Sequence, residues 1–176
     1  GQMGTGVAQT VAQFGMKALL ADVDLARAEA GKGKIDQALG KLVGRGKITP
    51  DEATAALGRI TATADYAPMI EAELIIEAAT EKEEIKHRIF AEAGKVLGAD
   101  AIMASNTSSI PITRMAVSSP DPARFIGLHF FNPVPVMGLI EVIPGLATSK
   151  ETVARTRAFA EGLSKQVVLA EDEPGF

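Results

Sequence analysis

The sequence holds two histidines, and His129 is the one placed to move a proton. It ends an apolar run, residues 125–129, that is typical of a strand, and ligands of α/β proteins gather at strand ends. Glu141 follows 12 positions later (141 − 129 = 12), beyond the turn Asn132-Pro133-Val134-Pro135. A returning antiparallel strand would therefore bring its carboxylate to the imidazole. Such a carboxylate fixes the imidazole tautomer and stabilises the imidazolium that forms when a proton arrives.

Each of these residues also has a purely structural interpretation. His129 alone could be a hydrogen-bonded strand-end residue, and Glu141 alone could be a charge on an edge strand. The second histidine, His87, lies in the charged segment 83–88, where a solvated helix surface is expected. His129 and Glu141 are therefore the candidate general base and its partner.

A second motif, at the start of the chain, indicates a dinucleotide site. Gly1-Gln2-Met3-Gly4 matches the second half of a G-x-G-x-x-G fingerprint, whose glycines let a helix N-terminus approach a pyrophosphate. Asp22 ends the next predicted strand, 22 − 4 = 18 residues after Gly4 and near the spacing of about 20 expected of a ribose-binding acid. Its charge would repel a 2′-phosphate, which predicts NAD rather than NADP. The alternatives are a flexible chain start for the glycines and a turn-starting acid for Asp22.

The elements that must position these residues alternate between short strands and longer helices, which predicts one α/β domain over residues 1–176. We expect a Rossmann-type, doubly wound sheet, mostly parallel with an antiparallel edge, whose first strand would precede Gly1. Thr49-Pro50-Asp51-Glu52 predicts a capped helix start. The expected strands are 17–22, 60–63, 74–77, 101–104, 125–129, 139–143 and 166–170, and the expected helices are 4–14, 25–42, 50–57, 81–97, 111–117 and 152–163.

The composition narrows the partners. The 22 acidic and 18 basic residues leave a net charge of −4, which offers no electrostatic footprint for nucleic acid or an anionic membrane. There is no cysteine, so disulfides, thiolate metal sites and cysteine nucleophiles are excluded. No apolar run approaches the roughly 20 residues of a membrane span. We expect a soluble, cytoplasmic protein of bacterial type, or a mitochondrial-matrix one if eukaryotic, that acts on a small molecule and uses no metal.

Several segments together resemble one family, the L-3-hydroxyacyl-CoA dehydrogenases. The matching segments are Glu77-Ala78-Ala79-Thr80-Glu81, residues 104–109 (ASNTSS), residues 127–137 (GLHFFNPVPVM), Glu141-Val142-Ile143 and the terminal Pro174-Gly175-Phe176. The resemblance covers nearly the whole chain. It implies NAD-dependent interconversion of an (S)-3-hydroxyacyl-CoA and a 3-oxoacyl-CoA, with short chains such as 3-hydroxybutyryl-CoA, in fatty-acid or butanoate metabolism. One departure is Gly138, where many relatives carry Lys, which bears on either turn geometry or the CoA phosphates.

The resemblance also implies roles that the residues alone do not give. Ser108 would hydrogen-bond the substrate oxygen near the nicotinamide, Asn132 would help place the nicotinamide, and Glu81 and Lys86 would lie near the cofactor riboses. From the sequence alone, residues 106–109 form a turn with capping side chains, and Glu81 and Lys86 are helix-surface charges. The expected cofactor-binding set is Gly1, Gln2, Met3, Gly4, Asp22, Ala78, Glu81, Lys86, Asn106, Ser108 and Asn132, and the expected catalytic set is His129, Glu141 and Ser108.

The family further implies a catalytic asparagine just beyond the Pro-Gly-Phe at residues 174–176, and a mostly helical C-terminal domain that forms a homodimer and closes the acyl-CoA site. Rival interpretations are the same domain within a multifunctional β-oxidation protein, a relative that oxidises a free sugar acid, and a Rossmann nucleotide-binding protein without turnover. Ser108, His129 and Glu141 together argue against the last of these.

Overall fold

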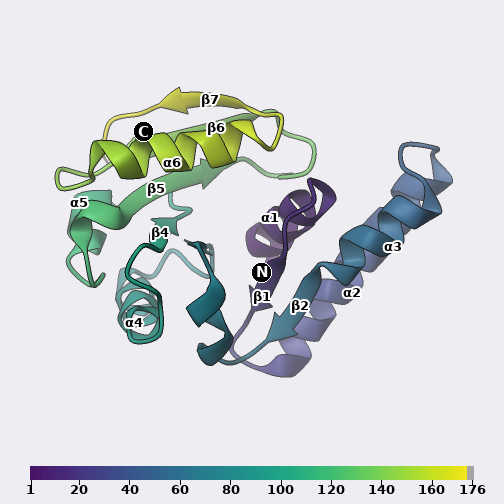
Figure 1. Cartoon of the computed structure of the whole chain (residues 1–176), viewed down its shortest axis with the longest axis horizontal. Coiled ribbons are helices and arrows are strands. Elements are labelled where there is room, and N and C mark those ends of the chain that lie inside the picture. Colours follow the sequence, from purple (N-terminus) through teal and green to yellow (C-terminus); the bar gives the residue numbers. More distant parts are fainter. Residues whose placement is uncertain (174–176) are drawn as a thin grey trace. The chain divides into compact units, whose positions relative to one another are not determined.

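The computed structural model describes residues 1–173 of the chain, in two compact units (Figure 1). The first unit comprises Gly1–Asp65 together with Asn132–Val136, and the second begins at Tyr66 and contains the rest. The terminal motif at residues 174–176 lies outside the described residues. No helix among residues 1–173 is both long and apolar enough to cross a membrane.

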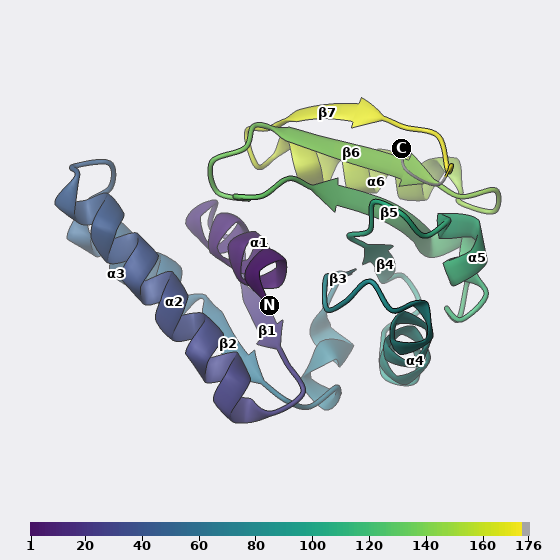
Figure 2. The ribbon, with the colours of Figure 1, turned by 180° about the vertical axis from the view of Figure 1, so that it is seen from behind.

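The first unit is built from three helices and two strands. Its elements are α1 (Gln2–Gln13), β1 (Ala18–Ala21), α2 (Leu25–Gly44), α3 (Pro50–Gly58) and β2 (Ile60–Thr63). Strands β1 and β2 pair in parallel, and Figures 1 and 2 both show α3 alongside α2. The chain leaves α1 through Gly15, whose φ of 91° lies in the left-handed region that favours glycine. The predicted capping box is confirmed, because the Thr49 hydroxyl accepts from the Glu52 N–H and the Glu52 carboxylate accepts from the Thr49 N–H.

Apolar side chains on facing helices form the core of this unit. Ala12 of α1, Ile35 and Leu39 of α2, and Ile60 of β2 are each at most 1% exposed. The spacing of Ala28, Ile35 and Leu39 places them on one face of α2. The core therefore fixes α1 and β1, the two elements that carry the glycine motif and lead to Asp22.

The second unit is a five-stranded sheet with helices. Its elements are η1 (Ala67–Glu71), β3 (Leu74–Glu77), α4 (Glu83–Gly94), β4 (Ile102–Ser105), α5 (Ile112–Ala116), η2 (Pro122–Arg124), β5 (Phe125–Phe130), β6 (Leu139–Pro144), α6 (Lys150–Glu161) and β7 (Gln166–Leu169). The strand order is β3-β4-β5-β6-β7, and the only antiparallel pair within this sheet is β5 with β6. Phe90 of α4 meets Phe125 of β5 edge to face, with ring centroids 4.7 Å apart, in the core of this unit.

The predicted fold class is confirmed as mixed α/β with a mostly parallel sheet and an antiparallel edge. The antiparallel part of the sheet comprises two strands, β6 and β7, because β7 pairs in parallel with β6. The short β5–β6 connection cannot cross over the sheet, which forces the antiparallel pairing. Most elements lie within two residues of their expected bounds. Helix α1 begins at Gln2 rather than 4, α4 spans Glu83–Gly94 rather than 81–97, and α6 spans Lys150–Glu161 rather than 152–163. Strands β1 and β2 form a two-stranded sheet of their own.

Candidate active site

The carboxyl ends of β3, β4 and β5 lie at one edge of the five-stranded sheet. These strands are parallel and end at Glu77, Ser105 and Phe130, with Glu77 opposite Ser105 in the register. Ligands of parallel sheets bind outside such strand ends. The segments that follow these strands, including the turn at residues 106–109, therefore belong to one site.

His129 and Glu141 form the pair that the sequence spacing predicted. They are direct partners in the β5–β6 register, and His129 Nδ1 lies 3.1 Å from Glu141 Oε1. Their side chains are 14% and 16% exposed, so the pair is largely withdrawn from water and still reachable from one side. The ring of Phe131 packs against the imidazole with a centroid distance of 4.6 Å. A carboxylate at Nδ1 fixes the tautomer and the orientation of the imidazole.

The turn that follows β4 is braced from two sides. Asn106 is buried, and its Oδ1 accepts a 2.7 Å hydrogen bond from the Phe130 N–H at the end of β5. Glu81 Oε2 accepts from the Thr107 and Ser109 hydroxyls, both at 2.9 Å. Ser108 is exposed and lies between Thr107 and Ser109, whose hydroxyls both donate to Glu81. The structure therefore gives Asn106 and Glu81 a positioning function that the sequence did not reveal.

Lys86 overturns the sequence-based expectation of a helix-surface charge. Its side chain is 0% exposed, and Nζ donates a 2.6 Å hydrogen bond to Glu77 Oε1 at the end of β3. A signal for this burial was present, because Lys86 shares a helical face with the buried Phe90 and Ala93. The expectation failed because Glu77, which was treated only as a strand end, supplies the counter-ion inside the protein.

The second histidine belongs to a separate ionic cluster on α4. His87 Nδ1 is hydrogen-bonded to the Ser118 hydroxyl, and its Nε2 lies 3.2 Å from Glu83 Oε1. Arg114 donates two hydrogen bonds to the same carboxylate, at 2.6 and 2.8 Å. These bonds, Arg114 first and then His87, hold the pKa of Glu83 below its ordinary value. The stability that these bonds contribute is therefore fully present when the pH is above the ordinary pKa of Glu83. It is lost as the pH falls through the lowered pKa of Glu83 in the folded protein. The half-buried His87 has a structural use on α4.

The residues of the first unit fit the pyrophosphate and ribose of a dinucleotide. No atom lies within 4 Å of a Cβ built on Gly1 or Gly4, so the approach to the N-terminus of α1 is open. The first turn of α1 carries no acidic side chain, which leaves its N–H groups and dipole available to an anion. Asp22 Oδ2 lies 3.8 Å from the Gly1 nitrogen, so the acid stands beside that helix start. Gly1, Thr5, Asp22, Arg27 and Lys34 are among the residues that line a cavity of about 200 Å³ there.

The segment that follows Phe131 packs onto the glycine-rich helix. A Cβ on Gly6 would come within 2.9 Å of the Val134 Cβ, so this close approach requires glycine at position 6. Asn132 is exposed and Ala78 is half-buried, and neither makes a side-chain contact that defines a role. Gly138 has open space around a built Cβ and is not among the glycines with positive φ, so turn geometry does not require glycine there.

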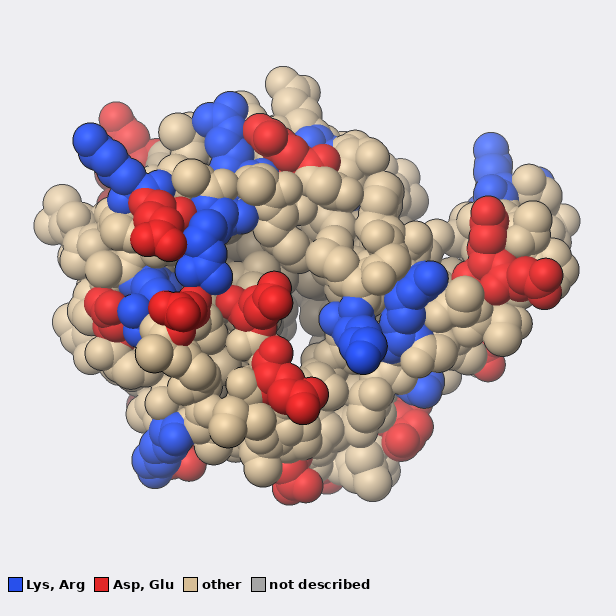
Figure 3. Space-filling model, in the orientation of Figure 1, with Lys and Arg blue, Asp and Glu red and all other residues tan. Residues whose placement is uncertain are grey.

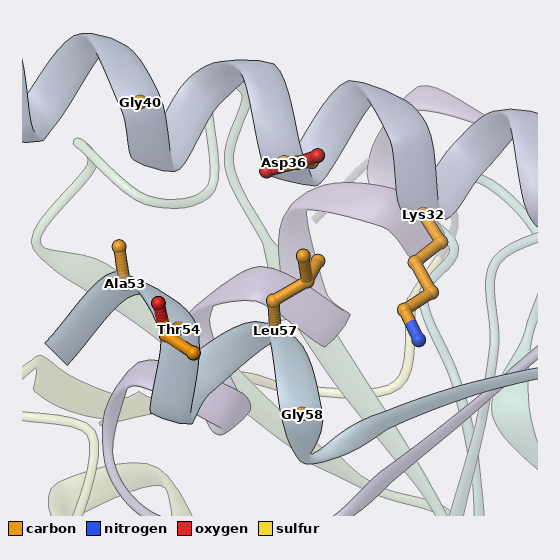
Figure 4. Close-up of a pocket in the computed structure, with 7 residues that line it drawn as sticks. All are labelled: Lys32, Asp36, Gly40, Ala53, Thr54, Leu57 and Gly58. Carbon is orange, nitrogen blue, oxygen red and sulfur yellow. The ribbon is translucent and has the colours of Figure 1, made fainter. Parts of the chain in front are cut away.

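A second cavity, of about 340 Å³, lies between α2 and α3 (Figure 4). Ala53 and Leu57 point from α3 toward α2, and Lys32 and Asp36 of α2 also line it. None of the candidate site residues from the sequence lines this cavity.

Basic and acidic side chains are interspersed over the face in Figure 3. Within residues 1–173, no group of histidine and acidic side chains is arranged to hold a metal ion.

An α/β domain with a glycine-rich helix start and an acid after the next strand defines the class of nucleotide-binding domains. Residues 1–173 match the family model described as 3-hydroxyacyl-CoA dehydrogenase, NAD binding domain. The chain belongs to this family.

Three relatives place the chain within the family. It is 45% identical over 176 residues to a probable 3-hydroxybutyryl-CoA dehydrogenase of Deinococcus radiodurans, with all of this chain and 63% of that protein covered. The crystal structure of an (S)-3-hydroxybutyryl-CoA dehydrogenase from Ralstonia eutropha matches with a TM-score of 0.97 and 39% identity, over all of this chain and 62% of that one. A fatty acid oxidation complex subunit alpha of Psychrobacter arcticus is 39% identical over all of this chain and 24% of its own length. The chain thus spans about three fifths of the first two of these relatives.

Proposed function

We propose that the protein interconverts an (S)-3-hydroxyacyl-CoA and a 3-oxoacyl-CoA with NAD, and that its substrates are short-chain esters such as 3-hydroxybutyryl-CoA. The observation that carries this proposal is the His129–Glu141 pair, 3.1 Å apart on β5 and β6 in an NAD binding domain. Oxidation of a secondary alcohol needs a base for the hydroxyl proton and a hydride acceptor, and this domain offers both. The names of the relatives support the four-carbon substrate.

In the proposed reaction His129 takes the hydroxyl proton of the substrate on Nε2 during oxidation and returns it during reduction. Glu141 holds Nδ1, keeps the imidazole in one tautomer and balances the charge of the imidazolium. Ser108, exposed on the anchored turn, would donate a hydrogen bond to the same substrate oxygen. The α1 N-terminus would receive the pyrophosphate, Asp22 would accept hydrogen bonds from the adenosine ribose, and Ala78, Glu81 and Asn132 would lie along the cofactor. NAD supplies the hydride acceptor when bound.

A second candidate is the same activity within a multifunctional protein. The 39% identity to a fatty acid oxidation complex subunit, of which this chain covers 24%, supports it. In either case we propose that the protein forms a homodimer. The multifunctional rival would also carry a hydratase. An assay of the full-length protein for hydration of crotonyl-CoA therefore separates the two candidates, because hydration is expected only of the multifunctional protein.

The proposed function is tested by a steady-state assay of the full-length protein. With acetoacetyl-CoA and NADH, we expect absorbance at 340 nm to fall with a kcat of roughly 1–10³ s⁻¹, the usual range for enzymes. A ten-carbon 3-oxoacyl-CoA should give a lower kcat/KM. Binding of NADH without turnover of any 3-oxoacyl-CoA would instead indicate a nucleotide-binding protein.

Replacing Glu141 with glutamine should lower kcat roughly 10-fold to 10²-fold, less than the loss of the base itself, because the imidazole that takes the proton remains. The amide can still accept a hydrogen bond from Nδ1, but it carries no charge to balance an imidazolium. The affinity for NADH, measured by its fluorescence, should stay within a few-fold. Glu151→Gln, on the exposed start of α6, is the matched control and should leave kcat unchanged. Equal kcat for the Glu141 variant and the parent would exclude Glu141 from proton transfer.

A further inference from the structure

Glu77 is a fully buried carboxylate whose two oxygens each have assigned partners. Its side chain is 1% exposed, and that of Lys86 is 0% exposed. Oε1 accepts from Lys86 Nζ at 2.6 Å and from the Ser105 hydroxyl at 2.8 Å, and Oε2 accepts from the Ala79 N–H at 2.8 Å. This carboxylate therefore joins the loop after β3, the first turn of α4 and the end of β4.

The three partners of Glu77 each control part of the candidate active site. Ser105 ends β4 and immediately precedes the turn at residues 106–109. Ala79 lies in the loop between β3 and α4, two residues before Glu81, which braces the same turn. Lys86 anchors the first turns of α4, which follows that loop. A shift of the Glu77 carboxylate would therefore move the loop at 78–81 and the turn that carries Ser108 together.

The chemistry of the cluster favours positioning over stability alone. A buried ion pair contributes little net stability, because the loss of hydration of both charges offsets their attraction. Apolar residues of similar volume would fill the same space equally well. They could not accept hydrogen bonds from the Ala79 N–H and the Ser105 hydroxyl at fixed angles. The charged pair therefore specifies a geometry that an apolar pair would leave undefined.

We propose that Glu77, with Lys86 as its counter-ion, is a positioning residue that sets the loop at 78–81 and the turn at 106–109 relative to each other for cofactor binding and catalysis. The proposal rests on the proposed function, because the reaction defines what the loop and the turn must position. Glu77 itself touches neither substrate nor cofactor. It acts through Ala79, Ser105 and Lys86 on the residues that would.

The test separates stability from positioning with a double replacement. Glu77→Gln alone leaves Lys86 as an uncompensated buried cation, and Lys86→Met alone leaves Glu77 as a buried anion, so both should lower Tm. The double variant Glu77→Gln/Lys86→Met removes both charges and should recover most of that Tm, but its amide offers one accepting oxygen where the carboxylate offers two, so the Ala79 N–H and the Ser105 hydroxyl cannot both keep their acceptors. Its kcat/KM for acetoacetyl-CoA should nevertheless remain at least about 10-fold below the parent, since displacements near 1 Å can cost 10²-fold. Glu84→Gln, exposed on α4, is the matched control and should change neither quantity.

Two further readouts keep the test decisive. Hydrogen exchange in the full chain of the double variant should rise at residues 78–81 and 106–109 and stay unchanged in α2 and α3, and the NADH affinity measured by fluorescence should weaken several-fold. Ser105→Ala, which leaves the ion pair intact, should lower kcat/KM about 3-fold to 10-fold, with a smaller loss of Tm than either single charge replacement causes. The double variant and Ser105→Ala within 2-fold of the parent in kcat/KM, NADH affinity and loop exchange would overturn the proposal. If the parent itself shows no turnover, the proposed function has failed, and the exchange and NADH measurements still decide the role of Glu77.

Discussion

Replacing His129 with glutamine is expected to lower kcat by roughly 10² to 10⁴ while NADH affinity barely changes, the range that positioned acid–base groups contribute. The physical reason is that glutamine fills a similar space and can hydrogen-bond but cannot take up the hydroxyl proton. Glu141, 3.1 Å from Nδ1, would then have no imidazolium to stabilise. Steady-state and stopped-flow assays of the full chain with acetoacetyl-CoA and NADH measure the loss directly.

The matched control is the other histidine. His87 contacts Ser118 and Glu83 on a different face of α4 from the buried Lys86, so His87→Gln should lose some stability and keep kcat within a few-fold. A His129 variant as active as the His87 variant would remove His129 from its proposed role. The proton would then have to move through another group.

The His129–Glu141 pair could be predicted because its determinants are local. The two residues are 12 positions apart, the Pro-containing turn between them is short, and the antiparallel register follows from that turn. The same holds for the Thr49–Glu52 capping box, which lies within four residues. Contacts between residues that are close in the sequence depend on their local spacing, so they can be predicted before the fold is known.

Contacts between distant segments could not be predicted in the same way. The bonds from Asn106 to the Phe130 N–H and from Thr107 to Glu81 join residues 24 and 26 positions apart, and no spacing rule indicates such partners. Asp172 is the extreme case. Its carboxylate accepts from the Ile112 and Thr113 N–H groups across 60 and 59 positions, and so caps α5 from outside the helix. One acid within the run Glu171-Asp172-Glu173 gives no such signal in the sequence.

The burial of Lys86, which the sequence did not predict, shows that tertiary contacts can override the exposure expected from the residue type. A lysine in a helix rich in glutamate is normally solvated. The other charged side chains of α4 are indeed not among its buried residues. The helical period puts Lys86 on the same face as Phe90, however, and the acid at the end of β3 makes burial of the ammonium possible. A buried lysine thus becomes predictable only when a strand-end acid is paired with the inward face of the helix that follows. That pairing is the basis of the function inferred for Glu77.

The cofactor preference is expected to favour NAD over NADP by roughly 10²-fold in kcat/KM, because Asp22 would face the 2′-phosphate of NADP and like charges brought together cost several kcal/mol. No basic residue directly follows Asp22, but Arg27 and Lys34 line the same cavity. Asp22→Asn removes the repulsion and leaves these two cations, so the preference should narrow at least about 10-fold. Asp24→Asn, which keeps a good N-cap for α2 while removing a nearby charge, is the matched control and should leave the ratio nearly unchanged. A parent that prefers NADPH, or two variants that shift the ratio equally, would show that Asp22 does not face the ribose.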